Sequence, residues 1–153
     1  DSKQWALKQG ADLILDRHYD YDTQLKEKEI SGFDYILCCT EVDEILDKLL
    51  SIANPFGHIC TIVGSSKLLD LSGFIYKAVG LSWESMGARP LYKFDLERQH
   101  YILTQGAILL DAGILTPWVG VTYDKATIEN LRAGHILQES GNAIGKITYI
   151  ACF

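Results

Sequence analysis

Two apolar stretches joined by one helical segment constrain the fold of this chain most strongly. Residues 33–39 and 59–63 have the composition of buried strands, and the second ends at a Gly-Ser-Ser turn. Two such strands separated by one helix make a parallel βαβ unit, and open α/β sheets bind ligands at the carboxyl ends of their strands. We therefore expect any binding chemistry at four residues: Cys39, Thr40, Val63 and Gly64.

The segment between these strands has the pattern of an amphipathic helix. Over residues 42–52, apolar side chains recur at helical spacing and form one stripe, made of Val42, Ile45, Leu46, Leu49 and Leu50. Acidic side chains lie opposite the stripe. We interpret Asp43, Glu44 and Asp47 as a solvated helix face rather than as a general acid/base pair.

The remaining segments continue an alternating order of strands and helices. Further strands are expected at 11–16, 81–86, 116–123 and 146–152, and helices at 2–9, 20–30, 125–139 and from the Arg89-Pro90 turn to Gly113. The last of these helices has five expected core residues: Leu96, Tyr101, Leu103, Ile108 and Leu109. The order indicates an α/β protein, and the unbroken apolar run at 33–39 predicts a central strand covered on both faces.

Length, composition and charge exclude several classes of protein. The chain has 153 residues, 48% of them hydrophobic, which suffices for one folded domain. Its net charge of −6 and its lack of a Lys/Arg cluster argue against a nucleic-acid partner. No apolar stretch approaches the roughly 20 residues of a membrane span, and residues 1–5 do not resemble a signal peptide. We expect a cytoplasmic protein without a membrane partner.

The cysteines and histidines do not have the spacing of a metal site. The four cysteines, at positions 38, 39, 60 and 152, lie in apolar segments, where a free thiol acts as a small hydrophobic group. Cys38 and Cys39 would point to opposite faces of a strand, which opposes joint chelation. The four histidines are scattered, and His58 is expected to be exposed. We expect no metal site.

Arg89, next to Pro90, is the cation nearest to the expected strand at 81–86. An Arg side chain in such a place could bind a ligand phosphate or carboxylate. A solvated charge or a structural ion pair is the more frequent role of an Arg at the start of a helix. We favour the structural role for Arg89.

Five segments keep an order and spacing typical of one enzyme superfamily. They are GADLILD at 10–16, FDYILCCT at 33–40, PFGHI at 55–59, GARP at 87–90 and ESGNAIGKI at 139–147. Together they resemble the carboxyl-terminal half of the medium-chain dehydrogenase/reductase superfamily, in its zinc-type alcohol dehydrogenase-like and quinone oxidoreductase branch. The resemblance covers nearly the whole chain.

This resemblance implies a Rossmann-like parallel sheet with flanking helices, lacking the first Gly-rich βα unit. No G-x-G-x-x-G motif, which holds the pyrophosphate in such enzymes, occurs in the sequence. Residues 1–113 would form a partial nucleotide-binding domain, and residues 114–153 would be the segment that returns to the catalytic domain. The substrate domain and any zinc ligands it carries would lie ahead of the chain, so zinc is not expected here.

The resemblance also implies an NADP(H)-dependent oxidoreductase. Hydride would pass between the nicotinamide and a ketone, enone, quinone or alcohol, and no residue of the chain is identified as acid or base. The cofactor-binding residues it implies are Cys39, Thr40, Thr61, Ile62, Val63, Gly64, Ser65 and Met86. Main-chain groups near Val63 and Gly64 would make the hydrogen bonds to the nicotinamide side.

The strand near Trp83 is the edge through which relatives often pair two subunits, so the resemblance implies a homodimer. Two alternatives stay open at this point. One is a folded, non-catalytic domain that binds a nucleotide weakly or pairs with itself through this strand. The other is a small flavodoxin-like protein that is complete as it stands.

Overall fold

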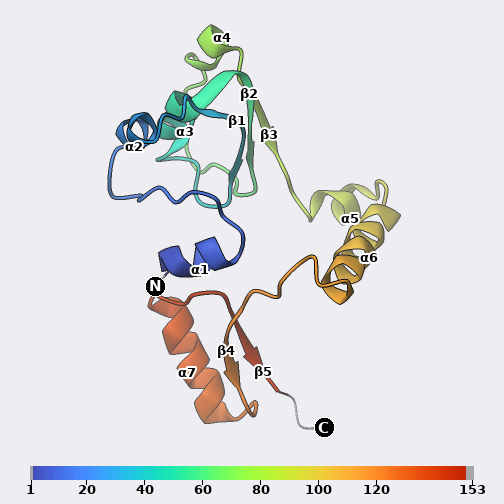
Figure 1. Ribbon diagram of the computed structural model, residues 1–153. Coiled ribbons are helices and arrows are strands. Elements are labelled where there is room, and N and C mark those ends of the chain that lie inside the picture. The colour runs from blue at the N-terminus through green and yellow to red at the C-terminus, as the bar shows by residue number, and fades with distance from the viewer. Residues whose placement is uncertain (1, 151–153) are drawn as a thin grey trace. The chain divides into compact units, whose positions relative to one another are not determined.

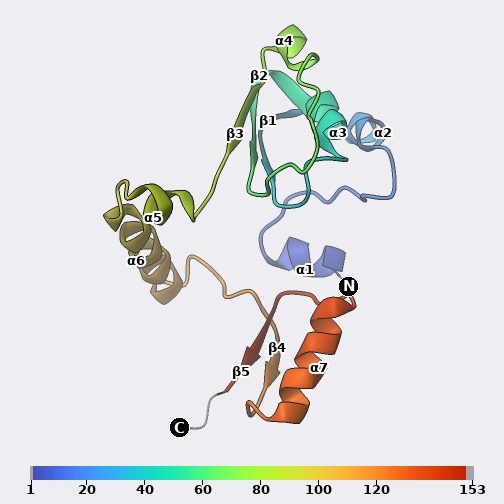
Figure 2. The ribbon, with the colours of Figure 1, turned by 180° about the vertical axis from the view of Figure 1, so that it is seen from behind.

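The computed structural model describes residues 2–150, which form two compact units. One unit is Leu15–Gln99, and the other joins the residues up to Ile14 with those from His100 onward. The division falls inside helix α6 (Glu97–Asp111). Figures 1 and 2 show the elements from two opposite sides. The domain division expected at residue 113 stays a prediction.

The unit Leu15–Gln99 is built on a three-stranded parallel sheet. Its strands are β1 (Phe33–Cys38), β2 (Ala53–Thr61) and β3 (Gly80–Trp83), in the spatial order β1-β2-β3. Its helices are α2 (Tyr21–Glu27), α3 (Leu46–Ile52), α4 (Phe74–Lys77) and α5 (Ala88–Tyr92). The predicted βαβ unit is confirmed as β1-α3-β2, and with it the α/β fold class (Figure 1).

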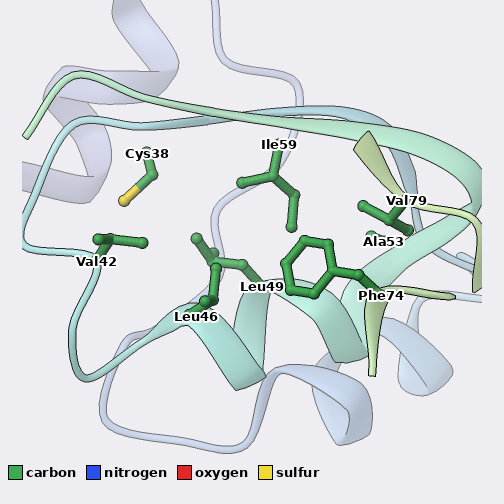
Figure 3. Close-up of a cluster of buried hydrophobic side chains, with 8 residues drawn as sticks. All are labelled: Cys38, Val42, Leu46, Leu49, Ala53, Ile59, Phe74 and Val79. Carbon is green, nitrogen blue, oxygen red and sulfur yellow. The ribbon is translucent and has the colours of Figure 1, made fainter. Parts of the chain in front are cut away.

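One face of this sheet carries the hydrophobic core. Ile59 of β2 is fully buried, and Leu46 and Leu49 of α3 pack against it together with Phe74 of α4 (Figure 3). Val42, which precedes α3, is also fully buried in this cluster. The apolar stripe predicted over residues 42–52 therefore packs on the sheet as expected.

The opposite face of the sheet differs from the expectation. Side chains alternate along a strand, so Tyr35 and Leu37 of β1 point away from the core. They are 86% and 63% exposed. Among the described residues β1 is also an edge strand, and β2 lies at the centre. The prediction of a central strand covered on both faces is wrong for β1, because apolar composition alone does not say how many faces of a strand are covered.

Lys77 closes the junction between α3 and β2, which follow one another without a linking residue. Its ammonium group donates to the carbonyl oxygens of Leu50, Ser51 and Ala53 at 2.9, 2.7 and 2.9 Å. The last carbonyl groups of a helix have no partner within the helix, and a cation there also complements the helix dipole. The chain can therefore pass from helix to strand directly.

The other unit contains a second, smaller parallel sheet. Its elements are α1 (Ser2–Lys8), β4 (Val119–Tyr123), α7 (Ile128–Glu139) and β5 (Lys146–Tyr149), and β4 pairs with β5. The rings of Tyr123 and Tyr149 stack with their centroids 5.3 Å apart. Gly134 of α7 is buried, and a Cβ atom there would lie 1.8 Å from the Tyr149 hydroxyl. Helix α7 can approach β5 this closely because residue 134 has no side chain.

Several predicted elements are wrong or shorter than expected. Residues 11–16 form no strand, and none of the strands within residues 2–150 pairs with them. The strand expected at 81–86 ends at Trp83. The strand expected at 116–123 begins at Val119, and that expected at 146–152 ends at Tyr149, with positions 151 and 152 outside the described residues.

The long helix expected up to Gly113 is two helices, α5 and α6. Lys93 caps α5 in a left-handed backbone conformation with φ of 50°, and Asp95, which also lies between the two helices, has φ of 46°. The five expected core residues of this segment are all exposed, between 36% and 74%. Helical periodicity identifies an apolar face but not what covers it.

Candidate functional site at the carboxyl ends of the strands

The carboxyl ends of the three strands lie side by side. Cys38, Thr61 and Trp83, the last residues of β1, β2 and β3, pair in register. Main-chain hydrogen bonds extend this pairing by one residue. The Ile62 amide donates to the Cys38 carbonyl at 3.1 Å, and the Glu84 amide donates to the Thr61 carbonyl at 2.9 Å. The segments that follow the strands are thus brought to one edge of the sheet.

The end of β1 presents short, exposed residues. The buried Cys38 thiol donates to the Thr40 carbonyl at 3.3 Å, which turns the chain away from the strand. Cys39 and Thr40 are exposed. The opposite orientation of the two adjacent cysteines is confirmed, and Cys39 and Thr40 remain accessible to a ligand.

The side chain of Thr61 has a structural role at the end of β2. It is fully buried, and its hydroxyl donates to the Val63 carbonyl at 3.1 Å and accepts from the Val63 amide at 3.4 Å. The Thr61 hydroxyl is thus engaged by the loop that follows its own strand. Of the residues predicted here, Thr61 fixes the turn, Ile62 is 48% exposed and Val63 is half-buried.

Gly64 leaves open space at this edge. A Cβ atom built on Gly64 would meet nothing within 4 Å, and Gly64 is not among the glycines with positive φ. Neither packing nor backbone conformation within the protein therefore requires a glycine at this position. The exposed backbone around Gly64 is suited to close approach by a flat ligand, because a side chain there would occupy the space.

Asp43 ties the loop after β1 to the loop after β2. Its Oδ2 atom accepts from the Ser66 amide at 3.0 Å and from the Ser66 hydroxyl at 2.7 Å. The Ser65 and Ser66 hydroxyls, the Ser66 amide and the charge of Lys67 hold the pKa of Asp43 below its ordinary value. The interpretation of Asp43 as part of a solvated helix face is wrong, since Asp43 precedes α3 and is half-buried.

A hollow of about 380 Å³ opens beyond the end of β3. Its lining residues are Trp83, Glu84, Ser85, Ala88, Arg89, Tyr92 and Phe94. Arg89 forms an ion pair with Asp95 at 2.5 Å, which agrees with the structural role favoured from the sequence. The predicted site residue Met86 lies beyond the strand, is 84% exposed, and accepts a hydrogen bond at its carbonyl from Gln99.

Residues 2–150 contain neither a cluster of metal-ligating side chains nor a helix that could span a membrane. No group of three or more His, Cys, Asp or Glu side chains among them could hold a metal ion. In the same residues, no helix has the length and apolar character needed to cross a membrane. The exposed His58 makes a 2.8 Å hydrogen bond with Ser82 on the neighbouring strand.

The structure thus brings together the predicted residues that follow β1 and β2, and adds Asp43 and Ser66 to them. Thr61 belongs to this edge only through its main chain, and Met86 follows β3. The sequence carried a weak signal for the Asp43 contact. Acceptors and donors that follow two adjacent parallel strands meet at one edge of the sheet, even when 23 residues separate them.

A parallel sheet whose strands end in turns of short residues with exposed main chain is typical of an α/β domain of the nucleotide-binding type. Comparison with known proteins assigns the family. The family model described as zinc-binding dehydrogenase matches residues 9–148, and the chain belongs to this family. The resemblance to medium-chain dehydrogenases is confirmed, and the alternative of a separate flavodoxin-like protein is wrong.

Individual relatives agree with this assignment. A zinc-type alcohol dehydrogenase-like protein of Staphylococcus aureus strain MRSA252 is 32% identical over 148 residues, which are 96% of this chain and 44% of that protein. A crystal structure from Rhizobium etli CFN 42, designated a zinc-dependent alcohol dehydrogenase, superposes with a TM-score of 0.79 at 26% identity, covering 95% of this chain and 42% of that one.

A third structure shares the fold at lower identity. It is an alcohol dehydrogenase of Escherichia coli CFT073 complexed with NADH, at a TM-score of 0.69 and 18% identity, covering 94% of this chain and 40% of that one. The chain therefore spans less than half the length of the relatives it matches.

Proposed function

We propose that this chain forms the nicotinamide side of the cofactor site of an NADP(H)-dependent oxidoreductase. Hydride would pass between the cofactor and a ketone, enone, quinone or alcohol. The observation that carries the proposal is the open backbone at Gly64, set at the carboxyl ends of three parallel strands in register. Sites for flat cofactors in open α/β sheets lie at this edge.

The residues present fit the nicotinamide half of such a cofactor. Exposed main chain at Gly64 would donate and accept hydrogen bonds with a carboxamide group, and the Val63 carbonyl, which already accepts from Thr61, has a second lone pair to offer. Cys39 and Thr40 at the adjacent strand end are exposed and short enough to lie beside a ribose. The bound cofactor supplies the hydride chemistry itself. The chain contributes orientation and a fixed polar surface rather than an acid or a base.

The relatives support the same class of reaction. The Staphylococcus aureus protein bears the name of a zinc-type alcohol dehydrogenase-like protein, and the Escherichia coli structure is a complex with NADH. Both names fit a nicotinamide-dependent oxidoreductase. The preference for NADP(H) and the carbonyl or quinone substrate rest on the sequence resemblance alone and are part of the proposal.

A direct test is to titrate the full chain with NADPH and with NADH and to monitor binding by tryptophan fluorescence. Trp83 ends β3 and is 49% exposed, so a ligand at this edge should change its emission. We expect saturable quenching at micromolar NADPH, with weaker binding of NADH. Failure of both nucleotides to bind would contradict the proposal.

Gly64→Val provides a matched variant for this titration. The valine Cβ atom would enter open space, with nothing of the protein within 4 Å of it, so we expect the fold to persist. We expect its Kd for NADPH to rise at least about tenfold, because the ring can no longer approach the backbone. Gly106→Ala, on a helix where a Cβ atom also meets nothing within 4 Å, should leave the Kd unchanged.

The second candidate function is a non-catalytic domain that pairs with itself through β3. Within residues 2–150 this strand is an edge of its sheet. Because the Glu84 amide points to β2, alternation along the strand directs the Trp83 amide to the free side. A homodimer through this edge would therefore use Trp83, and it is equally compatible with the oxidoreductase proposal.

Sedimentation velocity tests the pairing. Trp83→Pro removes an outward donor, and we expect it to be monomeric where the unaltered chain and Ser82→Ala are dimers. A stable dimer without any nucleotide binding would favour the non-catalytic function. The cytoplasmic location expected from the sequence also stays a prediction, which cell fractionation would test.

A further inference from the structure

We propose that Asp43 is a positioning residue, which holds the loop after β2 in the shape that presents the Val63–Gly64 main chain to the cofactor. The inference rests on the proposed function, because it assigns a role toward the same site. Asp43 itself would not touch the cofactor. It would act through Ser66, at the far end of the loop.

The loop is anchored at both ends. At its start, the buried Thr61 hydroxyl holds Val63 through two contacts. At its end, the Asp43 carboxylate accepts both the amide and the hydroxyl of Ser66. Between the anchors, the Ser65 hydroxyl donates to the Lys67 carbonyl at 2.6 Å and accepts from the Lys67 amide at 3.1 Å. Gly64 thus lies in a short segment that is fixed on either side.

The anchor at Asp43 is itself fixed by the core. Val42, the preceding residue, is fully buried and packs in the cluster with Leu46 (Figure 3). The Oδ1 atom of Asp43 is shielded from solvent and has no hydrogen-bond partner among the described residues. Through Oδ2 the carboxylate accepts from Ser66, with the Ser65 hydroxyl also acting on it, and the core transmits its position to the loop.

Charge strengthens this anchor. Hydrogen bonds to an ionised acceptor are stronger than those between neutral groups. The pKa of Asp43 is lowered by Ser65, by Ser66 and by the nearby Lys67, so the carboxylate is ionised at neutral pH. The Lys67 ammonium also forms an ion pair with Glu44, at 3.6 Å, so its positive charge acts on two carboxylates. A loop fixed before binding loses less conformational entropy on binding than a free one, and this raises affinity.

The control for the experiment is Asp70, which makes the same kind of contact in the connection that follows. Its Oδ1 atom accepts from the Ser72 amide at 2.8 Å, and its pKa is also lowered by Ser72. Unlike Asp43, Asp70 contacts a residue only two positions away and links no second strand end. A general loss of loop order would affect both variants alike.

The test measures the Kd for NADPH by fluorescence for Asp43→Ala, Ser66→Ala, the double variant and Asp70→Ala, in the full chain. We expect Asp43→Ala and Ser66→Ala each to raise the Kd about tenfold, and the double variant to raise it no further, because both remove one anchor. Asp70→Ala should leave the Kd within about twofold of the unaltered chain.

Asp43→Asn distinguishes positioning from a loss of fold. Asparagine retains an acceptor at the Oδ2 position for Ser66, although it loses the negative charge and places an amide nitrogen at the shielded Oδ1 position. We expect it to restore the Kd to within about threefold of the unaltered value. Additive effects of Asp43→Ala and Ser66→Ala, or equal effects of Asp43→Ala and Asp70→Ala, would overturn the inference. If the unaltered chain binds no NADPH, the proposed function fails instead.

Discussion

The hydroxyl of Tyr149 lies directly over Gly134, so that a Cβ atom at position 134 would come within 1.8 Å of it. The Tyr149 ring cannot easily turn aside, because it stacks on Tyr123. The contact between α7 and β5 thus depends on the absence of one side chain.

Gly134→Ala should therefore destabilise the protein, by about 1–3 kcal/mol, as expected for overpacking of a fixed contact. Gly106→Ala is the matched control, because its Cβ atom meets nothing within 4 Å. In a helix interior Ala is favoured over Gly by up to about 1 kcal/mol, so this change should stabilise. Urea unfolding of both variants measures the change in unfolding free energy, which should have opposite signs. A Gly134→Ala variant that is more stable than the unaltered chain would contradict the close contact between Gly134 and Tyr149.

Lys77→Met should destabilise the unit Leu15–Gln99. The methionine keeps most of the apolar stem but leaves three carbonyl oxygens without their donor, at a cost of about 1–3 kcal/mol. Lys67→Met serves as the control. Its ammonium makes a single exposed ion pair with Glu44 at 3.6 Å, worth at most about 1 kcal/mol. Equal urea midpoints for the two variants would show that Lys77 does not hold this junction.

Stability should fall in acid. The Thr23 hydroxyl and amide, bound to the Asp20 carboxylate, hold the pKa of Asp20 below its ordinary value of about 3.9, and the pKa values of Asp43 and Asp70 are lowered as well. A lowered pKa in the folded state contributes stability above pH 4 that is lost as the pH falls through the folded-state value.

Asp20→Asn isolates one of these groups. Asparagine also caps a helix, so the variant should match the unaltered chain at pH 7. Below pH 4 its urea midpoint should decline less steeply, since residue 20 no longer titrates. A decline as steep as that of the unaltered chain would show that Asp20 does not contribute.

Gly80→Ala should displace the His58 ring, because a Cβ atom at position 80 would lie 2.5 Å from its Nδ1 atom. The displacement would break the hydrogen bond between His58 and Ser82, at a cost of about 0.5–1.5 kcal/mol. In a His58→Ala background the same glycine substitution should cost much less. A double-mutant cycle on unfolding free energies measures the difference, and strict additivity would contradict this contact.

Much of the fold could be predicted because its signals are local. The apolar stripe of α3 predicts a helix by its spacing, and the continuous apolar runs of β1 and β2 predict strands. Two strands with one helix between them can be arranged in few ways. Residues 11–16 have a similar composition and form no strand. A strand needs a neighbour to satisfy its backbone, and the sequence of a segment does not say whether a neighbour is present.

The site was predicted less completely. Short residues at the ends of β1 and β2 follow from the topology, which places Cys39 and Val63 at one edge. The contact between Asp43 and Ser66 depends on the exact path of two loops, which no periodicity encodes. Thr61 was expected to face a ligand, but its hydroxyl turns inward to Val63. Whether the Thr61 side chain faces a ligand or the turn at Val63 depends on the backbone geometry after the end of β2.

The direct passage from α3 to β2 also limits how this chain can change in length. An α-helix rotates by about 100° per residue, so a single residue inserted between Ile52 and Ala53 would swing the helix carbonyls away from Lys77. If the helix kept its place instead, β2 would have to take up the extra residue between Ala53 and His58, where its pairing with β1 is already irregular, or else turn Ile59 out of the core. The junction therefore has no spare residue, and the side chains on both sides of it, Ile52 and Ala53, are buried.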